Sequence, residues 1–288
     1  MSYSINDFYK SIVLKLQALY SAEEAHAMAD RLFEHYFQLT PTRRVLAADS
    51  PVNSAKMLLA EESVIKLLSN IPLQYVLGIA YFMEMEFVVN PSVLIPRPET
   101  EELVSLIVKQ YSGWKSTHQL SILDIGTGSG CIPVALKRYI PGSIVSAIDI
   151  SQEALEVATE NAALNKVEIN FSKTDILNHA QSKLLTEFDL IVSNPPYVTM
   201  AEKKYMQPNV FDNEPHTALF VPNDDPLVFY REIFILSKTK LLDGGSLWFE
   251  INEMYGIELR DMALHHGFKE ANIFFDIRGK SRFLQCFI

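Results

Sequence analysis

Four consecutive residues, Asn194-Pro195-Pro196-Tyr197, combine side-chain and backbone groups that suit the binding of a planar NH2 group. They follow the apolar run 188–192, which predicts a buried strand with these four residues at its carboxyl end. The prolines fix φ and lack N–H groups, so the loop is stiff and leaves the carbonyls of Asn194 and Pro195 free as acceptors. A planar nitrogen can donate to the Asn194 side-chain oxygen and the Pro195 carbonyl while its plane stacks on Tyr197. The alternative is a proline-rich turn without chemistry.

A glycine-rich loop lies between a predicted strand and a predicted helix. Residues 120–125 predict the strand, Gly126-Thr127-Gly128-Ser129-Gly130 the loop, and residues 131–140 the helix. Alternate glycines let a ligand approach the backbone closely and leave N–H groups at the helix start for an anionic group. The dinucleotide fingerprint G-x-G-x-x-G is not matched, because Cys131 and Pro133 stand where its third glycine would fall. A Walker loop also fails, since no Gly-Lys-Ser/Thr is present.

Two aspartates fall at the ends of the next predicted strands. Asp149 follows residues 143–148, and Asp175 follows Lys173-Thr174. A carboxylate at the first position can accept hydrogen bonds from both hydroxyls of a ribose, and one at the second can meet the exocyclic amine of adenine. A lone aspartate at a strand end is usually solvated, but its place one strand after a glycine loop favours ligand binding. We therefore expect a nucleoside-containing ligand at this edge of the sheet.

Composition indicates a globular protein with little support for nucleic-acid binding. The 288 residues are 48% apolar, which is enough for a sizeable core and for two domains. With 35 acidic and 25 basic residues, and a net charge of -10, the chain lacks the positive excess that phosphate contacts require. The basic residues form short, scattered groups, typical of solvated surface. We expect no stable nucleic-acid binding, although local contact with RNA stays open.

The rest of the composition predicts no metal, no disulfide and no membrane span. Cys131 and Cys286 are far apart, and Cys131 is expected to pack within the first turn of its helix. The seven histidines show no ligand spacing, and the adjacent His265 and His266 would point in different directions on a helix. Residues 1–20 carry Asp and Lys in a helical pattern, unlike a signal peptide, and no run approaches twenty apolar residues. We expect a cytoplasmic monomer.

The first part of the chain predicts a small all-helical domain over residues 1–80. Ser21 and Glu24 form a capping-box pattern before one of its helices. From composition alone, this domain is either a cap or a substrate-docking module. Its later helices are expected over about residues 22–37, 43–48 and 54–68.

A linker and a larger α/β domain follow. Residues 81–98 predict a β-hairpin linker with strands at 85–89 and 93–95. In the domain 99–288, alternating strand and helix patterns predict a parallel sheet with ligands at the carboxyl ends of its strands. Residues 273–276 and 283–288 predict a terminal antiparallel hairpin.

The glycine loop, the acidic strand ends and N-P-P-Y together resemble the class I S-adenosylmethionine-dependent methyltransferases, a Rossmann-like α/β fold class. In that class, N-P-P-Y after the fourth strand marks methyl transfer to a planar nitrogen of adenine, cytosine or glutamine. The closer resemblance is to the HemK/PrmC family of peptide chain release factor glutamine N5-methyltransferases, and it covers nearly the whole chain. It rests on L-I-P-R-P-E-T-E at 94–101, D-I-G-T-G-S-G, N-P-P-Y, E-P-x-x-A-L and residues 276–282.

That resemblance implies that the helical domain docks a class I release factor and that the catalytic domain methylates the glutamine of its Gly-Gly-Gln loop. S-adenosylmethionine would be the methyl donor and S-adenosylhomocysteine the product, without a metal. The resemblance implies that residues Gly126 to Gly130 hold the methionine part of the cofactor, that Asp149 holds the ribose, and that Asp175 and Ile176 hold the adenine. It also implies that Asn194 contacts both cofactor and substrate and is catalytic together with Pro195, Pro196 and Tyr197, which bind the substrate amide. Arg97 would contact the substrate.

Two positions depart from the family pattern. Ile176 stands where many relatives have an aromatic residue against adenine, and Glu250-Ile251-Asn252 stands where they often have Glu-His-Gly. Arg97, between two prolines, either orients the loop or pairs with a neighbouring carboxylate. Three other functions stay open: methylation of a ribosomal-protein glutamine, methylation of adenine N6 in nucleic acid, and a noncatalytic cofactor-binding role in translation.

Overall fold

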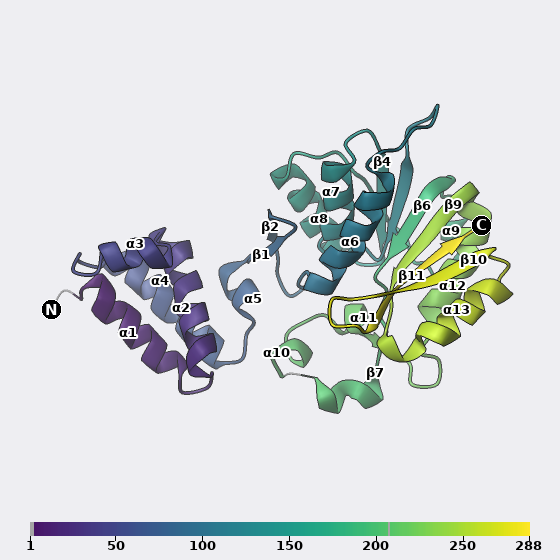
Figure 1. Ribbon diagram of the computed structural model, residues 1–288. Coiled ribbons are helices and arrows are strands. Elements are labelled where there is room, and N and C mark those ends of the chain that lie inside the picture. The colour runs from purple at the N-terminus through teal and green to yellow at the C-terminus, as the bar shows by residue number, and fades with distance from the viewer. Residues whose placement is uncertain (1–2, 207) are drawn as a thin grey trace. The chain divides into compact units, whose positions relative to one another are not determined.

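The computed structural model describes residues 3–206 and 208–288, which divide into two compact units (Figure 1). Unit 1 comprises residues 3–78 and 208–213, and unit 2 comprises residues 79–206 and 214–288. The core of unit 1 joins buried apolar side chains of three helices, among them Ile12, Leu32 and Val64. The helices of unit 1 are α1 (Ile5–Leu16), α2 (Ala22–Phe37), α3 (Pro41–Leu46), α4 (Ser54–Leu68), α5 (Leu73–Leu77) and α10 (Pro208–Phe211).

Side-chain caps explain where the helices of unit 1 begin. The Ser21 hydroxyl accepts the Glu24 N–H at 3.2 Å, and the Glu24 carboxylate accepts the Ser21 N–H at 3.1 Å, so the predicted capping box is confirmed. Asn53 caps α4, whose bounds agree with the predicted range. α3 begins at Pro41, two residues before its predicted start, because proline is well accommodated in a first helical turn.

The hairpin of unit 2 differs from its prediction. β1 (Ile79–Phe82) pairs antiparallel with β2 (Met85–Val88), whereas residues 93–95 form no strand, so the predicted second strand was wrong. The turn uses Met83 and Glu84 at φ 47° and 62°. Such a turn normally carries Asn-Gly or a similar pair, and these two side chains give no such signal.

A seven-stranded sheet forms the centre of unit 2, in the order β10-β11-β9-β6-β3-β4-β5. The strands from β9 to β5 run parallel, and β11 and β10 add an antiparallel hairpin at one edge, as the sequence predicted. A separate short parallel pair joins β7 (Val198–Thr199) to β8 (Phe220–Val221). The main strands are β3 (Ser121–Ile125), β4 (Ile144–Asp149), β5 (Asn170–Lys173), β6 (Phe188–Ser193), β9 (Leu241–Glu250), β10 (Glu270–Phe275) and β11 (Ser281–Phe287).

Helices cover both faces of this sheet (Figure 1). Leu190 and Val192 of β6 pack in one buried cluster with α6 (Pro98–Tyr111), α7 (Cys131–Tyr139) and α8 (Gln152–Leu164). Ile191 points to the other face, where α12 (Val228–Lys240) and α13 (Gly256–His265) complete the second cluster. Both faces of the sheet are therefore apolar and covered, so a polar ligand is expected at the edge formed by the carboxyl ends of the strands. Shorter elements are α9 (His179–Ser182), α11 (His216–Leu219) and the 3-10 helices η1 (Met200–Tyr205) and η2 (Glu253–Tyr255).

Among the described residues, no helix is both long enough and apolar enough to cross a membrane.

Candidate active site

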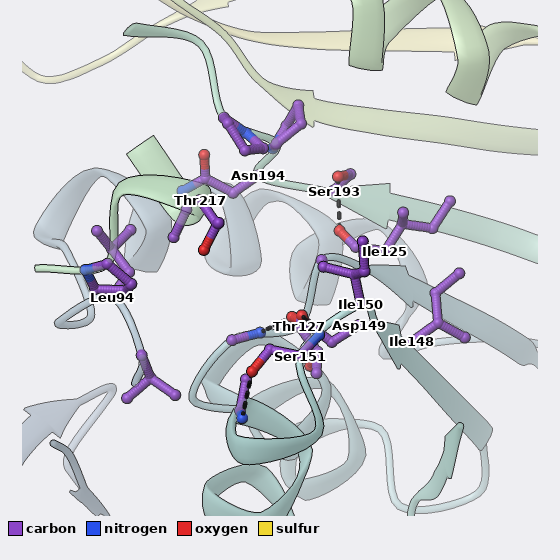
Figure 2. A pocket seen from close by; sticks show the side chains of 18 of the residues that line it. Leu94, Ile125, Thr127, Ile148, Asp149, Ile150, Ser151, Ser193, Asn194 and Thr217 are labelled. Atoms are coloured by element: carbon purple, nitrogen blue, oxygen red, sulfur yellow. Dashed lines mark hydrogen bonds between the residues drawn. The ribbon is translucent and has the colours of Figure 1, made fainter. Parts of the chain in front are cut away.

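A cavity of about 360 Å³ opens in unit 2 at the carboxyl ends of β3, β4 and β6. Segments around residues 92–97 and 215–220 complete its wall. Figure 2 shows Thr127, Asp149 and Ser151 on one side of the cavity and Asn194 and Thr217 on another. The glycine loop and the start of the N-P-P-Y motif, some seventy residues apart in sequence, thus line one cavity.

The glycines of the loop serve two different purposes. Gly126 and Gly128 line the cavity at φ 75° and 53°, and no heavy atom stands within 4 Å of where a Cβ would be. Gly130, at φ 79°, lies outside the cavity lining, and a Cβ there would stand 2.9 Å from the Cβ of Ala158 in α8. Gly126 and Gly128 leave room for a ligand, whereas Gly130 lets α8 approach the loop. A contact of Gly130 with the cofactor stays a prediction.

Asp149 and Asp175 both line the cavity, together with Ile176. The Asp149 carboxylate accepts the Gly128 N–H at 2.8 Å and the Ser151 N–H at 2.9 Å, one bond on each oxygen. A carboxylate has about four acceptor positions, so two are left for hydroxyl groups of a ligand. The structure thus brings the predicted ribose and adenine residues to one wall.

Unpaired polar atoms lie beneath the loop. The hydroxyl of Thr127 and both carboxylate oxygens of Asp124 are buried without a hydrogen-bond partner, and Thr127 faces the cavity. Burial raises the pKa of Asp124 to about 7, the nearby Thr127 hydroxyl opposes this effect although the geometry makes no hydrogen bond between them, and the Asp149 charge adds to it. A buried polar group without a partner is costly, so the Thr127 hydroxyl fits a polar ligand at the loop, whereas Asp124 does not line the cavity. From the sequence, Asp124 was predicted only as part of a strand.

Three of the four N-P-P-Y residues line the cavity, and the fourth, Tyr197, is partly buried beside it. Asn194, Pro195 and Pro196 line the cavity, but Tyr197 does not. The Tyr197 hydroxyl instead donates to Glu250 Oε1 at 3.1 Å, and burial and the Glu250 charge raise its pKa. Tyr197 is therefore a neutral donor, and its predicted stacking on a substrate amide stays a prediction.

Asn194 is held by two residues that the sequence analysis did not assign. Its Nδ2 donates to the Thr100 hydroxyl at 3.2 Å, and that hydroxyl donates to Glu250 Oε2 at 2.7 Å. Thr100 is 3% exposed and Glu250 is 2% exposed. Burial raises the pKa of Glu250, and the bonds from Thr100 and Tyr197 oppose that effect. The sequence feature that could have pointed to Thr100 was its place in the I-P-R-P-x-T-E element.

Arg97 pairs with a buried carboxylate at the cavity wall. Its Nη2 lies 2.6 Å from Glu214 Oε1, and the Glu214 side chain is 1% exposed. The structure thus has the carboxylate pairing that was one of the two alternatives for Arg97. Direct contact between Arg97 and a substrate stays a prediction.

Asn161 joins the hairpin to the glycine loop. Its Oδ1 accepts the Val88 N–H at 2.6 Å, and its Nδ2 donates to the carbonyls of Val88 and Ser129, both at 2.9 Å. The side chain is fully buried and acts as a strand partner for β2. These long-range bonds could not be read from local sequence.

Cys131 and Cys286 are both buried, as expected for Cys131, and burial raises the pKa of the Cys131 thiol to about 12. Within residues 3–206 and 208–288, no group of three or more His, Cys, Asp or Glu side chains is arranged to hold a metal ion.

Comparison with known proteins places the chain in a class and then in a family. Residues 101–217 match the Methyltransferase small domain, and residues 10–78 match the PrmC N-terminal domain. A crystal structure of a methyltransferase from Pyrococcus furiosus has the same fold, with a TM-score of 0.52 at 16% identity, over 79% of this chain and 98% of that one. Fold and matches define a methyltransferase with the class I S-adenosylmethionine-dependent architecture, as predicted.

The family follows from two near-full-length relatives. The Release factor glutamine methyltransferase of Flavobacterium psychrophilum is 40% identical over 281 residues, 98% of each chain. The Release factor glutamine methyltransferase of Bacteroides thetaiotaomicron is 40% identical over 269 residues, which cover 93% of this chain and 95% of that one. The chain therefore belongs to the release factor glutamine methyltransferase family, and the predicted resemblance is confirmed.

Proposed function

We propose that this methyltransferase transfers a methyl group from S-adenosylmethionine to the side-chain amide nitrogen, N5, of the glutamine in the Gly-Gly-Gln loop of class I release factors. The observation that carries the proposal is the orientation of Asn194 at the cavity. Because its Nδ2 donates to Thr100, its Oδ1 is the atom left to accept a hydrogen bond from a ligand.

The residues of the cavity fit the cofactor that this activity requires. Gly126 and Gly128 leave open space beside the loop, the Thr127 hydroxyl lacks a partner, and Asp149 keeps acceptor positions. We assign the methionine part to the loop, the ribose to Asp149, and the adenine to Asp175 and Ile176. When bound, S-adenosylmethionine supplies an electrophilic methyl group and leaves as S-adenosylhomocysteine. We propose that no metal takes part.

The protein contributes chiefly position and polarity. An amide nitrogen is a poor nucleophile because its lone pair is delocalised into the carbonyl. Hydrogen bonds from its two N–H groups to Asn194 Oδ1 and the Pro195 carbonyl hold the nitrogen in place and stabilise the positive charge that grows on it. The nitrogen gains the methyl group and loses one proton to water, so the side chain stays a neutral amide. The stiff double proline keeps the Pro195 carbonyl fixed during this change, and Thr100 holds the Asn194 side chain.

The helical unit supplies a surface for the protein substrate. α4 exposes Leu58 and Ile65, at 59% and 65%, and their spacing of seven residues places them on one helix face. Exposed apolar groups of this kind mark interaction surfaces. We propose that this face binds the release factor. Replacing Leu58 and Ile65 by serine should raise KM for an intact release factor but leave KM for a short Gly-Gly-Gln peptide unchanged; an equal rise for both would contradict docking.

The activity is tested with labelled cofactor and matched substrates. The purified chain is incubated with S-adenosylmethionine carrying a radioactive methyl group and with an unmodified class I release factor, in its Gly-Gly-Gln form or changed to Gly-Gly-Glu. Label in the first form alone supports the proposal. If neither form is labelled while cofactor binding is measured, the proposal fails, and ribosomal protein or adenine in nucleic acid becomes the acceptor to examine.

A further inference from the structure

A buried carboxylate lies two hydrogen bonds behind the proposed substrate acceptor. Glu250 is the last residue of β9, and Thr100 lies in the first turn of α6. The hydroxyl of Thr100 bridges Glu250 Oε2 and Asn194 Nδ2, at 2.7 and 3.2 Å. Glu250 does not line the cavity, so it acts on a ligand there only through its neighbours.

The direction of these hydrogen bonds fixes the orientation of Asn194. Thr100 has one hydroxyl hydrogen, and it donates this hydrogen to the Glu250 carboxylate. The hydroxyl oxygen then faces Asn194 as an acceptor and selects its NH2 group. Without the carboxylate the hydroxyl is free to rotate, and the amide of Asn194 loses its preferred orientation.

The same connection transmits charge. A hydroxyl that donates to a carboxylate becomes a stronger acceptor, and an amide that donates to such a hydroxyl carries more negative charge on its oxygen. The Tyr197 hydroxyl donates to the second carboxylate oxygen, so the side-chain oxygens of Glu250 each accept a hydroxyl. Negative charge on Asn194 Oδ1 is most valuable when the bound nitrogen becomes positive, which is during methyl transfer.

We propose that Glu250 and Thr100 are positioning residues that orient Asn194 and strengthen its Oδ1 as an acceptor for the substrate amide. This inference rests on the proposed function, since it assigns a cause to the amide recognition described there. It also gives a role to Glu250, the residue of the Glu250-Ile251-Asn252 segment that agrees with the family's Glu-His-Gly.

Kinetic tests separate this role from a contribution to folding. Thr100→Val keeps the shape of the side chain but removes the hydroxyl, and we expect kcat to fall about tenfold or more, with a smaller change in KM. Thr100→Ser restores the hydroxyl and should restore most of the rate. Glu250→Gln should lower kcat to a similar degree, whereas Glu253→Gln, a matched loss of charge at an exposed ion pair with Lys280, should not.

Combined variants test whether the residues act in series. Thr100 itself lines the cavity, but the inference has it act through Asn194, so Thr100→Val should add little to the loss in an Asn194→Ala background. Losses that multiply in the double variant, or a normal kcat in Thr100→Val, would overturn the inference. In the single Thr100 and Glu250 variants, affinity for S-adenosylhomocysteine measured by calorimetry should stay near that of the unaltered chain.

A spectroscopic measurement decides the inference without a methyl acceptor. The side-chain NH2 signals of Asn194 are identified in an amide nitrogen NMR spectrum by their loss in Asn194→Ala. We expect them to be shifted and to exchange slowly with water in the unaltered chain and in Thr100→Ser, but not in Thr100→Val. Signals unchanged by Thr100→Val would overturn the inference. Failure of the unaltered chain to label release factors would instead remove the proposed substrate.

Discussion

Arg97 Nη2 lies 2.6 Å from Glu214 Oε1, although the two residues are 117 positions apart in the chain. The Glu214 carboxylate also accepts the Ile95 N–H at 3.4 Å, so it ties the segment before α6 to Pro215 and the start of α11, which carries Thr217. Both segments line the cavity. The pair therefore holds two parts of the cavity wall together.

Removing the arginine should destabilise unit 2, because the buried Glu214 would lose its partner. We expect Arg97→Met, which keeps the apolar stem, to lower the free energy of unfolding by about 3 kcal/mol. Adding Glu214→Gln should recover much of this loss, as measured by urea unfolding of both variants. If the two losses simply add, the pair has no energetic coupling. A raised KM that persists in the stabilised double variant would support the predicted contact of Arg97 with substrate.

Asn194→Ala should reduce methyl transfer by about a hundredfold or more, the scale of one well-aimed polar contact in a preorganised site. The change removes the side-chain oxygen that accepts the substrate N–H but leaves the glycine loop and Asp149 in place. Single-turnover rates at saturating cofactor measure the effect on methyl transfer, and calorimetry with S-adenosylhomocysteine measures any accompanying loss of cofactor binding. A rate close to that of the unaltered chain would refute the role assigned to Asn194.

Two glycines of the loop should respond differently to the same substitution. Gly130→Ala places a methyl group 2.9 Å from Ala158 Cβ at φ 79°, so we expect a loss of about 3 kcal/mol in stability. Gly128→Ala, at φ 53° with no atom within 4 Å, should lose only about 1 kcal/mol. The methyl group of Gly128→Ala enters the cavity, so this variant should weaken cofactor binding more than Gly130→Ala does. Thermal unfolding and cofactor titration distinguish the two; equal stability losses would contradict the packing role of Gly130.

Asp124 should make stability depend on pH. Burial raises its pKa from 3.8 to about 7, so its proton is bound more tightly in the folded state than in the unfolded state. Its contribution to stability is therefore complete below pH 3.8 and is lost as pH rises toward about 7. Asp124→Asn mimics the protonated form, so it should gain stability relative to the unaltered chain across that interval. Parallel curves of unfolding free energy against pH for the two proteins would contradict this assignment.

Local patterns predicted much of this protein. The Ser21-Glu24 capping box, the α4 range and the terminal hairpin follow from neighbouring residues and are found in the structure. The prediction of a second hairpin strand at residues 93–95 was wrong. The real turn is formed by Met83 and Glu84, which adopt positive φ but are not the residue types that usually indicate such a turn.

The parts of the site that were missed depend on long-range packing. Glu250 meets Thr100 across 150 positions, and Asn161 meets Val88 across 73. Such pairs are created when strands and helices assemble, and a single sequence contains no period or spacing that reports them. Tyr197 is a related case, since its motif suggested a role in stacking on the substrate while its hydroxyl is engaged with Glu250.

The most direct test of the central claim is to locate the transferred methyl group. An unmodified release factor is incubated with the chain and S-adenosylmethionine, digested with a protease, and analysed by fragmentation mass spectrometry. We predict one added methyl group on the side-chain amide of the Gly-Gly-Gln glutamine, and a strongly reduced methylated fraction when Asn194→Ala replaces the unaltered enzyme for the same incubation time. A methyl group on another residue, or an unmodified Gly-Gly-Gln peptide despite cofactor turnover, would contradict the claim.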